Sequence, residues 1–249
     1  MMRGILFGTV ALLATSALAA EAGQDDVKAA AKKLADADSY SWKQNTENAG
    51  GGGGGRGGGP TEGKTEKDGY TYLKMTRGNN TVEVVMKGDK AAIKTEDGWK
   101  TTEEAAQDNG GGQPNPARFL SRMLRNFKGP AAQAQDLADK VKELAKSDDA
   151  YSGDLSEEGA KQLLMFGGGG RRGGGNANGN GNAPEISNAK GSVKFWTKDG
   201  TLSKYEYHVQ GTISFNGNDR DVDRTTTVEI SDVGSTKVDV PDEAKKKLS

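Results

Sequence analysis

The feature that most constrains the fold is a series of alternating apolar segments joined by very short turns. In 81–87 every second residue is apolar, and Gly88-Asp89 then turns the chain into a second such segment, 91–95. Asn216-Gly217 is the strongest hairpin signal in the chain, because both residue types tolerate the left-handed backbone of a two-residue turn. Links of this length join antiparallel neighbours, since parallel strands need a crossover of about a dozen residues or more. The sequence therefore predicts an antiparallel sheet.

The expected strands form two groups separated by a helical insertion. The first group covers 39–46, 69–76, 81–87, 91–95 and a strand at Trp99, with 39–46 and 69–76 paired as a hairpin. The second begins around Val193 and Phe195, continues from Asp199-Gly200 to Phe215, returns through Val228 and Ile230, and ends with 237–240.

Helical spacing appears before, between and after these groups. Val27, Ala30, Ala31 and Leu34 share one face of a helix that Asp25 or Asp26 would cap. Three further helices are expected between Pro116 and Leu164, and a short one after Pro241. The order of elements predicts an α+β fold, with one antiparallel sheet and helices gathered on one of its faces.

Glycine-rich tracts interrupt the pattern at 50–59, 110–112 and 167–182, and contain many of the 37 glycines. Long glycine runs lose much entropy on ordering and bury no side chain, so we expect disordered surface loops there. Each Arg-Gly-Gly triplet occurs once in its tract without interleaved aromatic residues, which argues against an RNA-binding segment. With these loops set aside, 20–249 is expected to be one domain.

The first 19 residues are typical of a secretory signal peptide. Met1-Met2-Arg3 supplies a basic start, an apolar run extends from Ile5 to Ala20, and Ala17-Leu18-Ala19 forms a small-residue cleavage site. We therefore expect export, to the periplasm or the extracellular space. The chain has no cysteine, which excludes disulfides and a lipid-modified cysteine, so no stable membrane anchor is expected.

The residues that usually carry catalysis are sparse. His208 is the only histidine, and alternation places it on the more polar face of its strand. A histidine-centred triad and a zinc or copper site are therefore not expected. Aspartates alternate over 219–223 as in a calcium loop, but Arg224 and Ile230 stand where that loop requires glycine and glutamate. A charged edge strand is the better interpretation. A net charge of −1 gives no indication of nucleic-acid binding. We expect a non-catalytic protein without a cofactor.

The remaining candidate for function is the apolar face of the sheet with the helix stripe that would cover it. Alternation places the apolar side chains of each strand on one concave side. They form either a packed core or the wall of a cavity for an acyl chain. The candidate cavity residues are Leu73, Met75, Val82, Val84, Met86, Ile93, Phe119, Met123, Phe127, Phe195, Tyr205, Tyr207, Val228 and Ile230.

Four local phrases accompany this order of elements: Asp97-Gly98-Trp99, Tyr151-Ser152-Gly153-Asp154-Leu155, the run from Phe195 to Leu202, and Val238-Asp239-Val240-Pro241. With these phrases, the order of elements resembles the envelope lipoprotein carrier superfamily, the LolA-like and LppX-like lipid-binding periplasmic proteins. The resemblance implies a half-open antiparallel barrel with helices on its concave face and a cavity that binds acyl chains.

Two functions follow from this sequence as hypotheses. The first is an exported, non-catalytic carrier whose partner is a lipid or an acylated protein. The alternative is a structural or interaction protein with a packed core, whose Gly/Arg-rich loops contact envelope polymers or a partner protein. No nucleic-acid partner is expected in either case.

Overall fold

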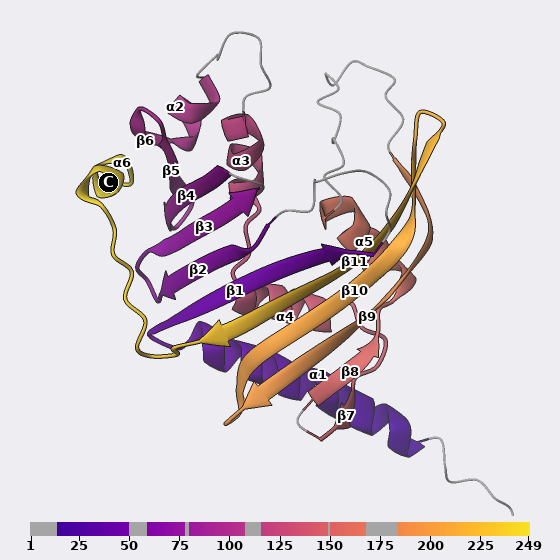
Figure 1. Cartoon of the computed structure of the whole chain (residues 1–249). Coiled ribbons are helices and arrows are strands. Elements are labelled where there is room, and N and C mark those ends of the chain that lie inside the picture. The colour runs from indigo at the N-terminus through magenta and orange to yellow at the C-terminus, as the bar shows by residue number, and fades with distance from the viewer. Residues whose placement is uncertain (1–13, 50–58, 78–79, 108–115, 149, 168–183) are drawn as a thin grey trace, which may run out of the picture.

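A computed structural model describes residues 14–49, 59–77, 80–107, 116–148, 150–167 and 184–249 (Figure 1). The elements are α1 (Ala14–Ala35), β1 (Ser39–Asn48), β2 (Thr61–Glu66), β3 (Thr71–Arg77), β4 (Asn80–Lys87), β5 (Lys90–Thr95), β6 (Gly98–Thr101), α2 (Thr102–Gln107), α3 (Pro116–Arg125), α4 (Pro130–Ala138), β7 (Ala145–Ser147), β8 (Ala150–Asp154), α5 (Glu157–Gly167), β9 (Glu185–Lys198), β10 (Thr201–Phe215), β11 (Asn218–Ser231) and α6 (Asp242–Lys247). The predicted signal peptide falls largely, and the glycine-rich tracts almost wholly, outside the described residues.

The eleven strands of the described residues belong to one open antiparallel sheet in the order β6-β5-β4-β3-β2-β1-β11-β10-β9-β8-β7. Two meanders, β1 to β6 and β7 to β11, are therefore joined where β1 pairs with β11. The hairpin at Asn216-Gly217 has positive φ at both residues, 52° and 74°, as the predicted two-residue turn requires. The predicted α+β class and single antiparallel sheet are confirmed (Figure 1).

The pairing within the first meander differs from the prediction. β2 lies between β1 and β3, so the predicted hairpin of 39–46 with 69–76 is wrong. β2 has the sequence TEGKTE, which contains no apolar residue and therefore gives no alternation signal. The predicted helical insertion likewise contains the strands β7 and β8, and 237–240 forms no strand.

One face of the sheet, the inner face, carries the main core. α1 buries Val27, Ala30, Ala31 and Leu34, as the spacing predicted, but it begins at Ala14, upstream of the expected aspartate caps. α1 packs against α4 and β10, and α5 packs against β9 and β10 (Figure 1). Each fully buried leucine in this layer contributes about 1.5–3 kcal/mol relative to an exposed one.

The terminal helix α6 is the exception to the one-sided arrangement of helices. Alternation in β4 turns Val84 into the main core and Val85 to the opposite, outer face. There Val85, Ala92 and Trp99 pack with side chains of the C-terminal segment, which include Ala244 of α6. The outer face of β4 to β6 is therefore covered as well.

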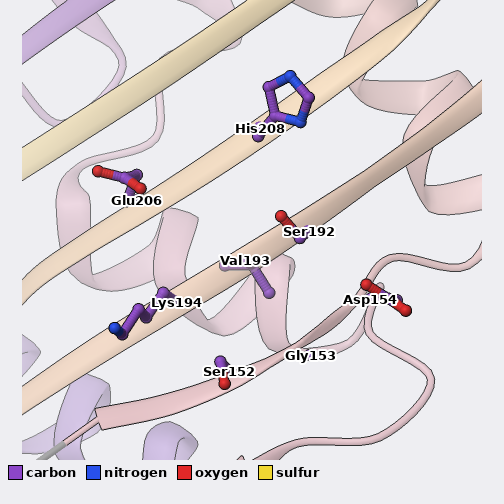
Figure 2. A pocket seen from close by; sticks show the side chains of 8 residues that line it. All are labelled: Ser152, Gly153, Asp154, Ser192, Val193, Lys194, Glu206 and His208. Carbon is purple, nitrogen blue, oxygen red and sulfur yellow. The ribbon is translucent and has the colours of Figure 1, made fainter.

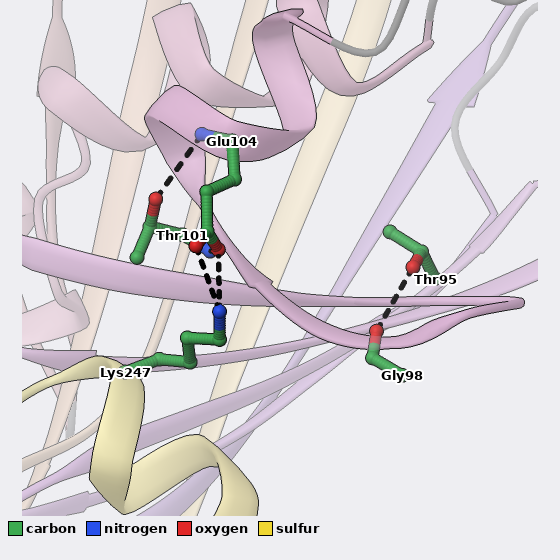
Figure 3. A network of polar contacts seen from close by, with 5 residues as sticks. All are labelled: Thr95, Gly98, Thr101, Glu104 and Lys247. Carbon is green, nitrogen blue, oxygen red and sulfur yellow. Dashed lines mark hydrogen bonds and ion pairs between the residues drawn. The ribbon is translucent and has the colours of Figure 1, made fainter.

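A small polar network ties α6 to α2 (Figure 3). Thr101 and Glu104 form a reciprocal capping box: the Glu104 amide donates to Thr101 Oγ1 at 3.1 Å, and the Thr101 amide donates to Glu104 Oε2 at 2.9 Å. Lys247 of α6 donates to the same carboxylate at 2.8 Å. These contacts fix α2, on which α3 rests.

Candidate functional site

The candidate cavity residues lie together on the inner face. The eight that are buried belong to the main core cluster: Leu73, Met75, Val84, Ile93, Phe195, Tyr205, Tyr207 and Val228. Five more are partly buried against it: Val82, Met86, Met123, Phe127 and Ile230. Phe119 lies on α3, but its side chain is outside the described residues.

The half of the inner face formed by β9 to β11 is tightly packed. Phe195, Tyr205 and Val228 have no exposed surface, and the two aromatic rings lie 6.3 Å apart. The Tyr205 hydroxyl hydrogen-bonds the Gln133 side chain of α4. Burial raises the pKa of Tyr205 well above its ordinary value, so the group stays a neutral donor. This half is a packed core, not an open surface.

The half formed by β2 to β5 is covered only in part: Leu73, Val84 and Ile93 are buried there, as are Leu120 and Leu124 of α3, but other apolar side chains are not. Val82 and Met86 of β4, Met123 of α3, and Phe127 just after α3 are apolar but only partly buried; residues 116–127 are called the α3 segment below. α3 has α2 as its principal packing partner, whereas α1 and α5 pack directly on strands. Ser121 Oγ of α3 donates to the Thr102 carbonyl of α2 at 2.9 Å. Partly exposed apolar side chains from both the sheet and the α3 segment, packed against one core, mark a place where an apolar ligand could enter.

Trp42 of β1 lies at the border of this partly covered half and was not among the predicted site residues. It is 5% exposed and stacks on Phe127, with ring centroids 6.2 Å apart and an interplanar angle of 23°. Its indole lies over Gly63 of β2, where a Cβ would come within 2.1 Å of Cε2. Among the described residues, Nε1 has no hydrogen-bond acceptor. Alternation put Trp42 on the apolar side, but the position of Gly63 beside it was not visible in the sequence.

Arg224 of β11 is a buried cation on the inner face. β11 lies between β1 and β10, so the predicted charged edge strand is wrong. Only 6% of Arg224 is exposed, and Nη2 donates to the Leu163 carbonyl at 3.1 Å. Burial lowers its pKa, but a guanidinium starts so high that it remains charged at neutral pH. Next to it along β11, Thr226 is buried and hydrogen-bonds Thr46 Oγ1 at 3.2 Å.

A polar pocket of about 330 Å³ lies on β8, β9 and β10 (Figure 2). Its lining consists of Ser152, Gly153, Asp154, Ser192, Val193, Lys194, Glu206 and His208. His208 lies on the polar side of β10, as predicted, and its Nε2 hydrogen-bonds Asp223 Oδ1 at 2.8 Å. In the described part of the chain no hydrogen bond joins Ser192 to His208, so this pair lacks the contact that activates a nucleophile.

Three or more histidine, cysteine, aspartate or glutamate side chains do not gather anywhere in the described ranges in a way that could hold a metal ion. The described helices include none with the length and apolar character needed to cross a membrane.

Comparisons with known proteins find similar structures but no similar sequence. No protein-family model matches the chain, and no curated protein matches it. Among solved structures, the lipoprotein LppX of Mycobacterium tuberculosis matches 89% of this chain and 99% of its own, at 10% identity and a TM-score of 0.44. LprF of Mycobacterium bovis matches 90% and 98%, at 11% identity and a TM-score of 0.45. A DUF1329 family protein of Desulfovibrio piger matches 86% and 91%, at 9% identity and a TM-score of 0.29.

Proposed function

We propose that this protein binds a lipid, or the acyl chains of an acylated protein, between the inner face of β1 to β5 and the α3 segment, and that it does so without catalysis. The observation that carries the proposal is that four apolar side chains of one core cluster, Val82, Met86, Met123 and Phe127, are only partly buried. Apolar side chains that pack against a core without being sealed in it can form the wall of an apolar site.

The position of α3 supports a role as a lid. It rests on α2 and is held there by Ser121, while α2 itself is fixed to β5 and β6. α3 can therefore move relative to the sheet without breaking strand pairing. Met75, Met86 and Met123 add side chains that adapt their shape, as expected of a site that receives flexible acyl chains.

The proposal includes export, with cleavage after Ala19. Cleavage there would remove the part of α1 from Ala14 to Ala19 and leave the rest of the helix in place. Intact mass measurement of the protein isolated from its native host should give a chain that begins at Ala20. A mass that retains Met1 would contradict the export step alone and leave the lipid site untouched.

The lipid site is tested by Met123→Asp, with Met165→Asp as the matched control. Met123 faces the proposed site, whereas Met165 on α5 is 53% exposed. A charge in an acyl-chain site is costly to desolvate, so Met123→Asp should abolish saturable uptake of a fluorescent fatty acid while the protein stays folded. Met165→Asp should take up the probe like wild type.

The opposite pair of results would support the interaction protein with a packed core, which the tight packing around Phe195 and Tyr205 favours. In that case wild type shows no saturable uptake, and Met123→Asp costs several kcal/mol of stability, as a charge buried in a core does. Organic extraction of native protein followed by lipid mass spectrometry distinguishes the carrier from the interaction protein independently of the variants. Stoichiometric lipid supports the carrier, and its absence supports the interaction protein.

A further inference from the structure

The indole N–H of Trp42 is a buried donor for which the described fold provides no acceptor. Buried tryptophan N–H groups usually find a partner, because an unmade hydrogen bond in a low-dielectric interior costs the full desolvation of the donor. Such a group in a native structure needs an explanation. A ligand that brings its own acceptor is one.

The surroundings of Trp42 place this donor in the proposed site. The indole extends from β1 over Gly63 of β2, and the Phe127 ring stacks on it from the α3 segment. Phe127 is itself one of the partly buried side chains of the lid, and Trp42 belongs to the same core cluster. The N–H therefore lies in the layer between sheet and lid where an acyl chain would lie.

The chemistry of the donor restricts what it can bind. An indole offers one neutral N–H and no charge. A free carboxylate or a phosphate in this layer would need a cation to offset its desolvation, whereas a neutral carbonyl oxygen needs only a donor. In an acylated lipid the ester carbonyl is attached directly to the apolar chain, so a bound chain carries this oxygen into the layer. An alkyl ether of the same chain length has no such oxygen.

We propose that Trp42 donates a hydrogen bond from Nε1 to the ester carbonyl of the bound lipid, so that the site selects O-acyl esters over alkyl ethers. This inference rests on the proposed lipid site and adds the class of ligand. Removal of the Trp42 donor should therefore leave the apolar site in place and abolish only the preference for esters over ethers.

The test compares a diacyl glycerol ester with its chain-matched dialkyl ether as ligands for wild type, Trp42→Phe and Trp99→Phe. Wild type should bind the ester about tenfold more tightly, the range expected for one buried hydrogen bond. In Trp42→Phe the ratio should fall to about one. Trp99 packs in the separate cluster under α6, so Trp99→Phe should keep the wild-type ratio.

A second measurement observes the hydrogen bond directly in wild-type protein and uses the Trp42→Phe variant only to assign the resonance. The chain has three tryptophans, and the indole N–H resonance missing from Trp42→Phe identifies that of Trp42. The ester should shift this resonance downfield, as hydrogen bonding does, and the ether should not.

The outcomes separate this inference from the function on which it rests. Equal binding of ester and ether by wild type, or an ester preference that survives in Trp42→Phe, overturns the role of Trp42 and leaves the lipid site standing. If wild type binds neither lipid, both proposals fall.

Discussion

Gly63→Ala should displace the Trp42 indole, and so it tests the contact between this ring and Gly63 beside the proposed lipid site. A Cβ on Gly63 would lie 2.1 Å from Cε2, 2.3 Å from Cζ2 and 2.5 Å from Nε1 of that ring. Real Cβ atoms do not approach within 3.0 Å of other heavy atoms, so the ring or the strand must move. Trp42 is buried and stacked on Phe127, which leaves it little room to rotate.

The expected cost follows from two limits. If the strand and ring shift slightly, overpacking costs about 1–3 kcal/mol. If the indole is displaced from its position over Gly63, the loss in free energy of unfolding approaches the roughly 3–5 kcal/mol of a buried Trp→Ala change. Alanine is better than glycine within a strand by about 0.5–1 kcal/mol, which offsets part of either cost. We expect a net loss of about 2 kcal/mol, and reduced fatty-acid uptake.

The assay is a double-mutant cycle measured by urea unfolding. In the Trp42→Ala background the added methyl group meets no ring, so Gly63→Ala should be neutral or slightly stabilising there. The coupling between the two positions should be about 2–3 kcal/mol, within the range of residues in direct contact. If Gly63→Ala leaves wild-type stability unchanged, or costs the same in both backgrounds, the indole does not rest on Gly63 and the reasoning fails.

Two further predictions concern stability away from the lipid site. Thr101→Ala removes the cap shown in Figure 3 and should lower the free energy of unfolding by about 1 kcal/mol in urea titrations, whereas Thr95→Ala, which leaves the capping box intact, should have the smaller effect. Asp136 on α4 tests the pH dependence. Partial burial acts to raise the pKa of Asp136, but hydrogen bonds from Lys140 and Lys128 outweigh it and hold the pKa below its ordinary value. The stabilisation is therefore present above about pH 4, the unfolded value, and lost as the pH falls through the lower folded value. Asp136→Asn should be less stable than wild type at pH 7, and the difference should shrink at acid pH. A pH-independent difference would contradict this assignment.

The candidate site was predictable in composition but not in its state of packing. The side of a strand to which Val84 or Tyr205 points depends only on alternation, so their shared inner face could be read from the sequence. Whether that face is sealed depends on which helix lies over it and how closely. Tyr205 is covered by α4, whereas Met123 belongs to α3, whose main packing partner is α2. No local sequence pattern indicates either arrangement.

What the sequence determined by itself is local. Asn216-Gly217 takes positive φ at both positions and turns the chain, and Val27 and Leu34 face the core from α1, because turn chemistry and helical period act over a few residues. Tertiary structure decided the rest. β2 has no apolar residue and exists because its neighbours pair with it, α6 covers the outer face, and the Trp42 ring rests on Gly63 from another strand. These features join segments far apart in the chain, and their free energy comes from contacts that form only when the whole sheet is assembled.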